Sequence, residues 1–291
     1  MELHGKLVRF LDKGIEFLGI LCENDTMVMP LDISNNMNDF IVHYDSFKQY
    51  LNKPNPLIPL SDITLLAPIK TPMQDVICLG INYMEHAVES MRFKNEAFDG
   101  KREEAVYFSK RINECNAPNG DFFITNNTSQ LDYEVELVVI IGKDCRHATR
   151  ENALDFVFGY TIGNDISARD LQQKHKQWYA GKSLEGAFPM GPCIVLRDDL
   201  DITNLDIKSY VNGELRQNSN TSKLIFDVPH VIAELSSYFT LKAGSIISMG
   251  TPSGVGMGFT PPKFLKAGDE VVCEIQGIGT LKTNIKLSNK E

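Results

Sequence analysis

The stretch LDYEVELVVIIG, residues 131–142, decides the fold. Successive side chains of a strand point to opposite faces, so Glu134 and Glu136 would lie on one face. The positions that share their face, or lie on the other, are apolar or aromatic: Tyr133, Val135, Leu137, Val138, Val139, Ile140 and Ile141. Apolar residues on both faces are typical of an interior strand. The segment therefore predicts a central strand with two carboxylates on one face.

Strand-like segments dominate the chain that surrounds this stretch. They include CIVLRD (193–198), IKSYVNG (207–213), SIISMG (245–250), EVVCEI (270–275) and TLKTNIKLS (280–288), with Gly, Asn, Asp and Pro between them. One clear helical pattern interrupts them, VPHVIAELSSYF at 228–239. Because strands and helices do not alternate regularly, we expect a strand-dominated α+β fold and not a doubly wound sheet.

Two proline-containing breaks, KPNPLIP at 53–59 and APIKTP at 67–72, divide the chain near its start. Alternating patterns at residues 6–22 predict two strands, and residues 42–51 have apolar spacing typical of a helix. The break at residues 67–72 follows them, so we predict a small N-terminal domain at 1–70 and a main body at 71–291. The charged stretch from Arg92 to Glu104 has poor periodicity and predicts a mobile loop.

The overall charge excludes some classes of partner. The 291 residues carry 29 basic and 38 acidic side chains, a net charge of −9, which disfavours binding to nucleic acid or an anionic membrane. None of the six cysteines forms a CxxC pair, so we expect reduced thiols. The first residues lack an apolar signal core, and no apolar run reaches the ~18 residues of a spanning helix. We expect a cytoplasmic protein.

Three carboxylates form a candidate metal site. Glu134 and Glu136 would repel each other inside a sheet and need a cation, unless their face is open to solvent. Asp165, in GYTIGNDISARD (159–170), should lie at a strand end and could be a third ligand, or else the N-cap of the next helix. Three carboxylates suit Mg²⁺, Mn²⁺ or Ca²⁺ better than Zn²⁺.

Other residues could carry out chemistry beside a metal. His86 and Glu89 would share a helix face, where the carboxylate orients the imidazole as a general base; the alternative is a solvated pair. Lys182 could bind a substrate carboxylate or a developing enolate. Thr251 could donate a hydrogen bond to an anion, and GVGMG (254–258) predicts a flexible turn.

The order of several segments resembles the fumarylacetoacetate hydrolase family. These segments are ICLGINYMEH (77–86), DYEVELVVIIGK (132–143), GYTIGNDISARDLQ (159–172), GKSLEGAFPMGP (181–192), NGELRQNSNTSKLIF (212–226) and SMGTPSGVG (248–256). The resemblance covers roughly residues 70–287. It implies the family's mixed β-sheet roll, preceded by the small N-terminal domain of two-part bacterial members, and a homodimer.

The resemblance also assigns roles to single residues. It implies a metal, usually Mg²⁺ or Mn²⁺ and in some members Ca²⁺, on Glu134, Glu136 and Asp165. It implies a catalytic His86–Glu89 pair on a lid that orders with substrate, with Lys182 in the pocket. Arg169 and Gln172 match pocket-wall positions, and Thr251 matches a contact to the substrate carboxylate.

One departure narrows the comparison within the family. Full fumarylacetoacetases have an upstream Asp as a fourth ligand and a catalytic Glu far along the chain, whereas Asn82–Tyr83 stand near that position here and the HxxE is local. The chain is therefore more similar to acylpyruvate hydrolases, oxaloacetate decarboxylases or tautomerases, and hydroxymuconate isomerases.

These observations lead to one expected reaction and several alternatives. We expect metal-dependent hydrolysis of a C–C bond in a small 2-oxo acid of the acylpyruvate type, through a metal-stabilised enolate. Oxaloacetate decarboxylation or tautomerisation and hydroxymuconate isomerisation would use the same residues. Outside enzymology, the chain could be a non-catalytic metal- or ligand-binding protein, or hold a purely structural metal.

Overall fold

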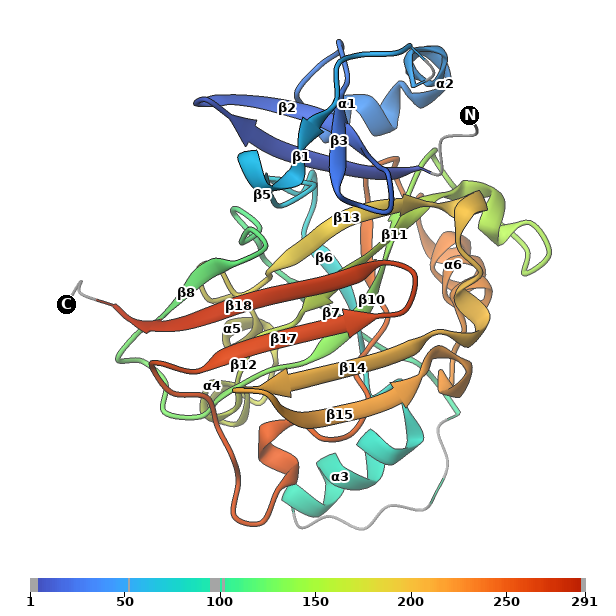
Figure 1. The fold of residues 1–291 in the computed structure, drawn as a ribbon. Coiled ribbons are helices and arrows are strands. Elements are labelled where there is room, and N and C mark those ends of the chain that lie inside the picture. The colour runs from blue at the N-terminus through green and yellow to red at the C-terminus, as the bar shows by residue number, and fades with distance from the viewer. Residues whose placement is uncertain (1–4, 52, 95–99, 101–102, 289–291) are drawn as a thin grey trace.

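The structure, a computed structural model, describes residues 5–288 except 52, 95–99 and 101–102 (Figure 1). Its N-terminal strands are β1 (Lys6–Asp12), β2 (Ile15–Cys22), β3 (Met27–Pro30), β4 (Ile58–Pro59) and β5 (Thr64–Leu66). The following strands are β6 (Val76–Gly80), β7 (Val106–Lys110), β8 (Gly120–Ile124), β9 (Leu131–Asp132), β10 (Val135–Ile141), β11 (Val157–Asn164), β12 (Ser167–Ala168), β13 (Met190–Leu196), β14 (Asp206–Val211), β15 (Glu214–Asn220), β16 (Ile246–Ser248), β17 (Glu270–Ile275) and β18 (Gly279–Leu287). The α-helices are α1 (Met37–Val42), α2 (Tyr44–Phe47), α3 (Met84–Lys94), α4 (Arg169–His175), α5 (Tyr179–Lys182) and α6 (Val228–Tyr238).

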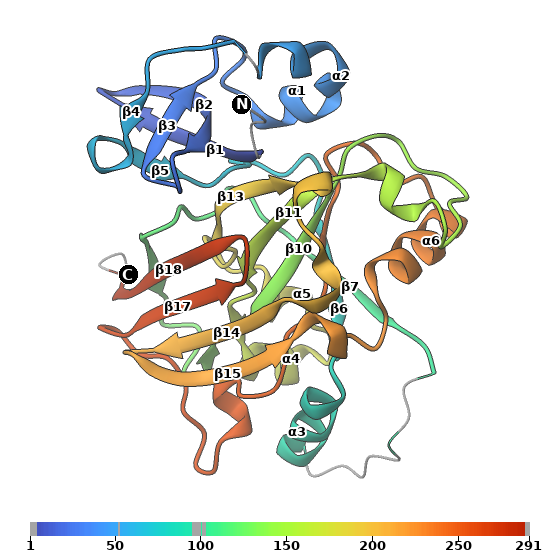
Figure 2. The same cartoon turned by 45° about the vertical axis from the view of Figure 1, so that its right-hand side comes forward.

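The larger sheet runs through both parts of the chain. Its strand order is β4-β3-β2-β1-β13-β11-β10-β16-β6-β7, and β5 also pairs with β1. The link between the two parts is the antiparallel pair β1–β13, in which Leu7 lies opposite Ile194. The N-terminal strands and α1–α2 nevertheless project from one end of the body (Figures 1 and 2). The division at residue 70 stays a prediction.

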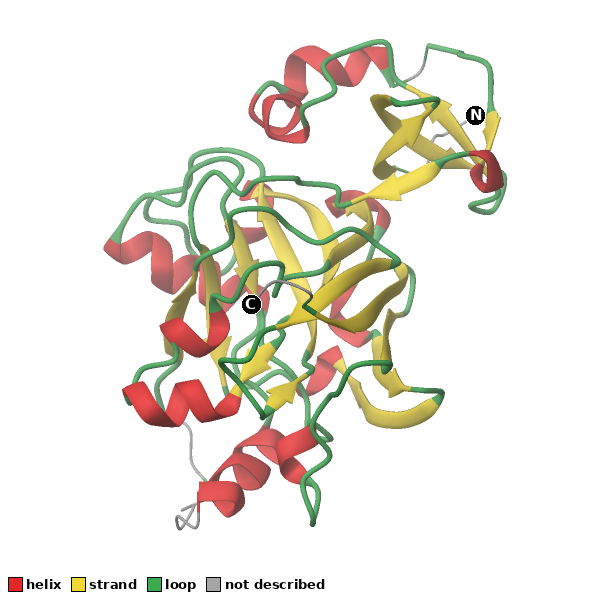
Figure 3. Ribbon diagram, turned by 90° about the vertical axis from the view of Figure 1, so that its left-hand side faces the viewer, coloured by secondary structure: helices red, strands yellow, loops and turns green. Residues whose placement is uncertain are grey.

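A second sheet covers the middle of the first. Its order is β15-β14-β17-β18-β8, and β14, β17 and β18 pack against β10, β11 and β13 of the larger sheet (Figure 2). Helices α3 to α6 lie around the outside of these strands (Figure 3). The structure therefore confirms a strand-dominated fold with mixed sheets, in which the facing sheets enclose a large apolar core.

Strand β10 is interior, as its sequence predicts, and every one of its residues is buried. Val135, Leu137, Val139 and Ile141 belong to one apolar cluster, while Val138 and Ile140 on the other face belong to a second cluster. The alternation thus separates two cores, and it places the two glutamates on the face of the second cluster. Burial of both faces removes the alternative of a solvent-exposed glutamate face.

The helix expected at 228–239 is α6, whose N-cap Asp227 accepts a hydrogen bond from the His230 backbone N–H. The loop expected between Arg92 and Glu104 begins later than predicted, because residues 92–94 belong to α3, and most of the remaining segment lies outside the described residues. Within the described part of the chain, no helix has the length and apolar character needed to cross a membrane.

Candidate active site

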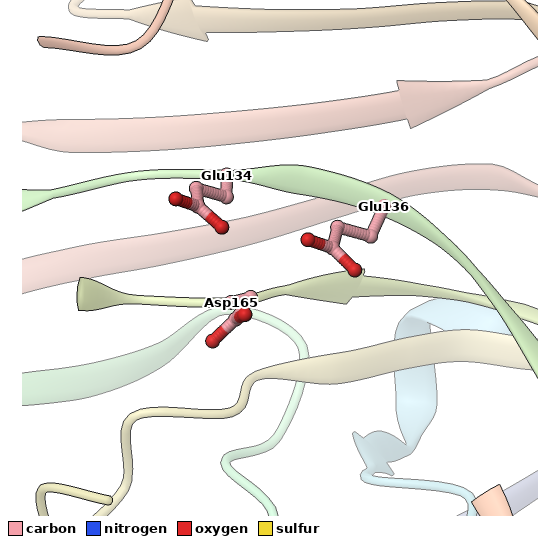
Figure 4. Close-up of side chains that lie close together, drawn as sticks. All are labelled: Glu134, Glu136 and Asp165. Carbon is pink, nitrogen blue, oxygen red and sulfur yellow. The ribbon is translucent and has the colours of Figure 1, made fainter. Parts of the chain in front are cut away.

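Three buried carboxylates lie close together where β10 begins and the neighbouring strand ends. Glu134 immediately precedes β10, Glu136 lies within it, and Asp165 directly follows the neighbouring antiparallel strand β11. One oxygen from each group lies within 4.8 Å of the others, and the three residues are at most 4% exposed. Figure 4 shows the three side chains close together, with Asp165 beside the two glutamates. The structure thus brings together the three residues that the sequence suggested as ligands.

Asp165 is not the N-cap of the following helix. Helix α4 has Ala168 as its N-cap, without a side-chain cap, and the Asp165 carboxylate turns instead to two buried lysines. Lys110 Nζ lies 2.6 Å from one of its oxygens, and Lys182 Nζ lies 2.6 Å from the other. Of the two readings of Asp165, the geometry agrees with the ligand and not with the helix cap.

Cations surround two of the three carboxylates. Lys182 Nζ is 2.6 Å from Glu134 Oε2 as well as from Asp165, and Arg169 Nη2 is 2.6 Å from Glu134 Oε1. Burial alone would raise the pKa of Glu134, but Lys182 and Arg169 outweigh it and hold this pKa well below its usual range. Burial would lower the pKa of Lys182, but Asp165 and Glu134 raise it. Glu134 is therefore ionised and Lys182 protonated.

Glu136 has a different environment. Its Oε2 accepts hydrogen bonds from Ser248 Oγ and from the Gly250 backbone N–H, but within the described residues it forms no ion pair. Burial, Asp165 and Glu134 together raise its pKa well above the usual value. A buried carboxylate beside two others is the group that a bound cation would stabilise most.

The buried cations around the triad do not balance the buried carboxylates. Asp132, Glu134, Glu136 and Asp165 lie against Lys110, Arg169 and Lys182, and Glu136 has no ion pair within the described residues. A cation would offset this excess of negative charge, and carboxylate oxygens are ligands that Mg²⁺, Mn²⁺ and Ca²⁺ accept. The triad could hold such an ion.

The His86–Glu89 pair lies in the first two turns of α3. His86 Nδ1 is 3.0 Å from Glu89 Oε2, and both residues are buried. Ile81, with a positive φ of 58°, turns the chain between β6 and this helix. Because Glu89 occupies Nδ1, Nε2 is the imidazole nitrogen available for proton transfer. The two residues are in contact and buried, so they are not a solvated surface pair.

The GVGMG segment is not the flexible turn that its sequence suggested. Residues Gly256–Gly258 form a short 3₁₀ helix whose Gly256 and Met257 backbone N–H groups donate to Asp132, at 2.6 and 3.0 Å. The Gly254 backbone N–H donates to Glu89 Oε1 at 3.0 Å. A Cβ at Gly258 would collide with that carboxylate. Local glycine content predicted mobility, but buried carboxylates from elsewhere in the chain fix this loop.

One cavity of about 530 Å³ is lined by two carboxylates of the triad and by the histidine of the pair, while Asp165 and Glu89 lie behind these residues. His86, Glu134, Glu136, Arg169, Gln172, Lys182 and Thr251 line it, together with apolar side chains that include Phe93, Phe108, Trp178 and Met257. Lys176 lies on the same wall, is exposed, and has no hydrogen-bonded or ion-paired partner for its side chain within the described residues. Ligand cavities typically combine such an apolar lining with a few converging polar groups.

The substrate-binding candidates are already engaged with protein groups. Arg169 Nε donates to Asp132 at 2.9 Å, and its Nη1 donates to Gln172 Oε1 at 3.2 Å. Thr251 Oγ1 donates to the Val135 carbonyl at 2.9 Å and accepts from Gln217 at 2.7 Å. These hydrogen bonds fix the orientation of both side chains at the cavity wall.

Several residues of this site could not be predicted from the sequence. Lys110, Asp132 and Ser248 contact the carboxylates or their partners, yet none belongs to a recognisable spacing motif. Lys110 reaches Asp165 only because β7 pairs with β6, which no local pattern reveals. The Asp in LDYE was the one available signal, since it directly precedes the two-glutamate strand.

Asn82 stands near the position where full fumarylacetoacetases have a further acidic ligand. Its amide is buried and is occupied by the backbone: Nδ2 donates to the Phe226 and Met249 carbonyls, and Oδ1 accepts from the Phe226 N–H. Asn82 therefore joins separate backbone segments beside Gly250. An asparagine cannot supply a fourth carboxylate ligand, and the amide atoms of this one are bonded to the backbone.

Comparison with known proteins identifies the family. The family model described as Fumarylacetoacetate (FAA) hydrolase C-terminal matches residues 75–286, so the chain belongs to the fumarylacetoacetate hydrolase family, whose members include enzymes of oxaloacetate chemistry. Oxaloacetate tautomerase YisK from Bacillus subtilis (strain 168) is 44% identical over 254 residues, covering 84% of this chain and 82% of that protein.

Solved structures agree with this assignment. A fumarylacetoacetate hydrolase from Exiguobacterium antarcticum is 36% identical with a TM-score of 0.85, over 97% of this chain and 99% of that one. A 5-carboxymethyl-2-hydroxymuconate delta-isomerase from Mycobacterium smegmatis is 30% identical with a TM-score of 0.78, over 97% of this chain and 100% of that one. The family's fold, including the N-terminal part, is therefore that of this chain.

Proposed function

We propose that this protein is a divalent-metal-dependent enzyme that interconverts the enol and keto forms of a 2-oxo dicarboxylic acid of the oxaloacetate type. The observation that carries the proposal is one cavity lined by His86, Glu134 and Glu136, with Asp165 grouped with the two glutamates and Glu89 in contact with His86. The 44% identity to a protein named oxaloacetate tautomerase supports the same reaction class. This places tautomerisation ahead of the hydrolysis expected from sequence.

The metal would be held by Glu134, Glu136 and Asp165, with Mg²⁺ as the ion we propose first and Mn²⁺ or Ca²⁺ as alternatives. When bound, it would act as a Lewis acid that favours negative charge on the 2-oxo oxygen. Lys182, buried and protonated beside the triad, adds positive charge at that end of the cavity.

The protein's own residues would perform the proton transfer and hold the substrate. His86, oriented by Glu89, would move a proton to or from the carbon next to the 2-oxo group. The Gln172 amide N–H groups would donate to a substrate carboxylate from the cavity wall, and Arg169 and Thr251 would do so by exchanging one of their protein partners for it. Lys176, unpaired within the described residues, would attract the second carboxylate of a dicarboxylic substrate.

Enol decay tests this proposal directly. Oxaloacetate prepared as its enol should ketonise faster with the protein and Mg²⁺, measured by loss of the enol's ultraviolet absorbance, and EDTA should return the rate to the buffer value. Equal rates with and without protein would reject the tautomerase assignment.

Hydrolysis of an acylpyruvate is the second candidate, and a specific feature favours it. The cavity of about 530 Å³, which His86 helps to line, is larger than a 2-oxo acid alone would need and could also take an acyl group and a water molecule. In that reaction His86 would take a proton from water, and the hydroxide would attack the distal carbonyl. NMR analysis of acetylpyruvate with Mg²⁺ would show acetate and pyruvate. Decarboxylation of oxaloacetate would instead give pyruvate and CO₂ without acetate.

Three expectations remain proposals of a simpler kind. We propose a homodimer, a cytoplasmic location, and no nucleic-acid or membrane partner, on the sequence arguments of charge and family resemblance. Size-exclusion chromatography with light scattering would test the dimer.

A further inference from the structure

Asp132 is a fully buried carboxylate to which the proposed chemistry gives no direct role. It accepts four hydrogen bonds. Oδ1 accepts from the backbone N–H groups of Tyr133 and Gly256, at 3.0 and 2.6 Å. Oδ2 accepts from the Met257 N–H at 3.0 Å and from Arg169 Nε at 2.9 Å. A buried carboxylate with this many donors fixes the positions of the backbone segments and of the side chain that donate to it.

On one side, Asp132 acts on the carboxylate triad through Arg169. The guanidinium is rigid and planar, so an oxygen held at Nε sets the direction of the other two nitrogens. Nη2 of the same group lies 2.6 Å from Glu134 Oε1. The position of a candidate metal ligand therefore depends on how Asp132 holds Arg169.

On the other side, Asp132 acts on the acid–base pair through the 254–258 loop. The Gly254 N–H donates to Glu89 Oε1 at 3.0 Å, and Arg92 Nη2 donates to the Gly258 carbonyl at 2.6 Å. Helix α3, which carries His86, thus rests on a loop whose middle is bonded to Asp132. Gly256 also allows this approach, because a Cβ there would lie 2.7 Å from Asp132 Oδ1.

We propose that Asp132 is a positioning residue that sets the His86–Glu89 pair and the Glu134–Glu136–Asp165 triad relative to each other, through the 254–258 loop and Arg169. The inference rests on the proposed function, because it assigns a purpose to the geometry of that same site. It goes further by making two halves of the site, from segments far apart in sequence, depend on one carboxylate.

Asp132→Asn separates this role from simple stabilisation. An amide has the same shape, but its NH₂ group would replace one of the two oxygens. That group would face N–H donors and could not accept their hydrogen bonds. Two readouts that need no substrate follow the two halves: Mg²⁺ affinity by calorimetry, and the His86 imidazole signal by NMR, assigned with His86→Ala. We expect Mg²⁺ affinity to fall about 10-fold and the His86 signal to move.

Asp269→Asn is the matched control. Asp269 is also buried and accepts from the Lys266 backbone N–H at 2.9 Å and from Asn212 Nδ2 at 2.8 Å, away from the cavity. It should lower the melting temperature and leave both readouts as in the wild type. Asp132→Asn with wild-type values for either readout would overturn the link, because Asp132 would then serve one half or neither.

A second variant decides the matter if Asp132→Asn does not fold. Arg169→Lys keeps the charge but cannot bond Asp132 and Glu134 in the same fork. The link predicts that it moves the His86 signal through the loop, and an unchanged signal overturns the proposal. Wild-type protein that binds no Mg²⁺ would count against the proposed metal, and the His86 signal in Arg169→Lys would still decide the link.

Discussion

Glu136 is the residue on which the candidate metal site depends most. Lys182 and Arg169 pair with Glu134, and two lysines pair with Asp165, but Glu136 has no ion pair within the described residues. Its position could be predicted from sequence because strand alternation needs no tertiary information. Lys110 could not be predicted, since its contact with Asp165 joins residues 55 apart in sequence, at strands that are not neighbours in the sheet.

Glu136→Gln should abolish Mg²⁺ binding and activity while the protein stays folded. The amide keeps the shape and can still accept from Ser248 and the Gly250 N–H, but it lacks the charge that a cation needs. Calorimetry with Mg²⁺ and circular dichroism check the two parts. The exposed Glu151→Gln is the control for a lost carboxylate. Turnover at the wild-type rate in Glu136→Gln would remove this residue from the mechanism.

His86→Ala should leave Mg²⁺ affinity close to wild type and slow enol–keto conversion by about 100-fold or more, the usual contribution of a general acid–base group. The reason is that His86 pairs with Glu89 and is not one of the three proposed ligands. His175→Ala, an exposed histidine outside the cavity, is the control. An unchanged rate in His86→Ala would mean that another group transfers the proton.

Lys176→Met should raise KM for oxaloacetate about 10-fold and leave KM for the monocarboxylate acetylpyruvate unchanged, since a charge-assisted hydrogen bond to a carboxylate is lost. Lys174→Met removes the same charge two residues earlier, at an exposed position outside the cavity. Steady-state kinetics on both substrates separate the two variants. Equal effects of Lys176→Met and Lys174→Met would assign the change to general electrostatics.

At the scale of elements, the contact between α3 and the 254–258 loop holds the acid–base pair. The helix could be predicted around HAVE, because i, i+3 spacing is local. The ordered conformation of the loop could not be predicted from its sequence, because its glycine content suggests mobility. Its order comes from Asp132 and Glu89, which lie far from it in the chain.

Gly258→Ala tests the loop as an element. The new Cβ would push against the Glu89 carboxylate, so the His86–Glu89 contact should be displaced and the rate should fall by about 100-fold. The backbone at Gly258 has no positive φ, so alanine adds no strain of its own. Rate measurements together with a thermal melt check this. A wild-type rate would show that Glu89 can move without consequence.

At the scale of the whole molecule, one sheet order brings the site together. β10 lies between β11 and β16, and β16 pairs with β6, so Glu136, Asp165, Ser248 and the start of α3 meet although they are distant in sequence. The strand-dominated class followed from composition and alternation. The pairing order did not, because parallel and antiparallel neighbours are chosen by long-range packing.

Removal of metal distinguishes a catalytic ion from a structural one. The triad is enclosed by two apolar clusters and extensive pairing, so the fold does not depend on the ion alone. EDTA should abolish activity and lower the melting temperature by only a few degrees, as binding linkage predicts for a moderately bound ligand. Calorimetric melts with and without Mg²⁺ measure this. Unfolding on chelation would indicate a structural metal.

The most direct test of the central claim, a metal-dependent proton transfer on a 2-oxo acid, is hydrogen exchange at oxaloacetate followed by NMR in D₂O. With protein and Mg²⁺, deuterium should enter the carbon next to the 2-oxo group faster than in buffer, without release of acetate, and EDTA should remove the acceleration. Exchange with protein and Mg²⁺ that is no faster than in buffer would contradict the account.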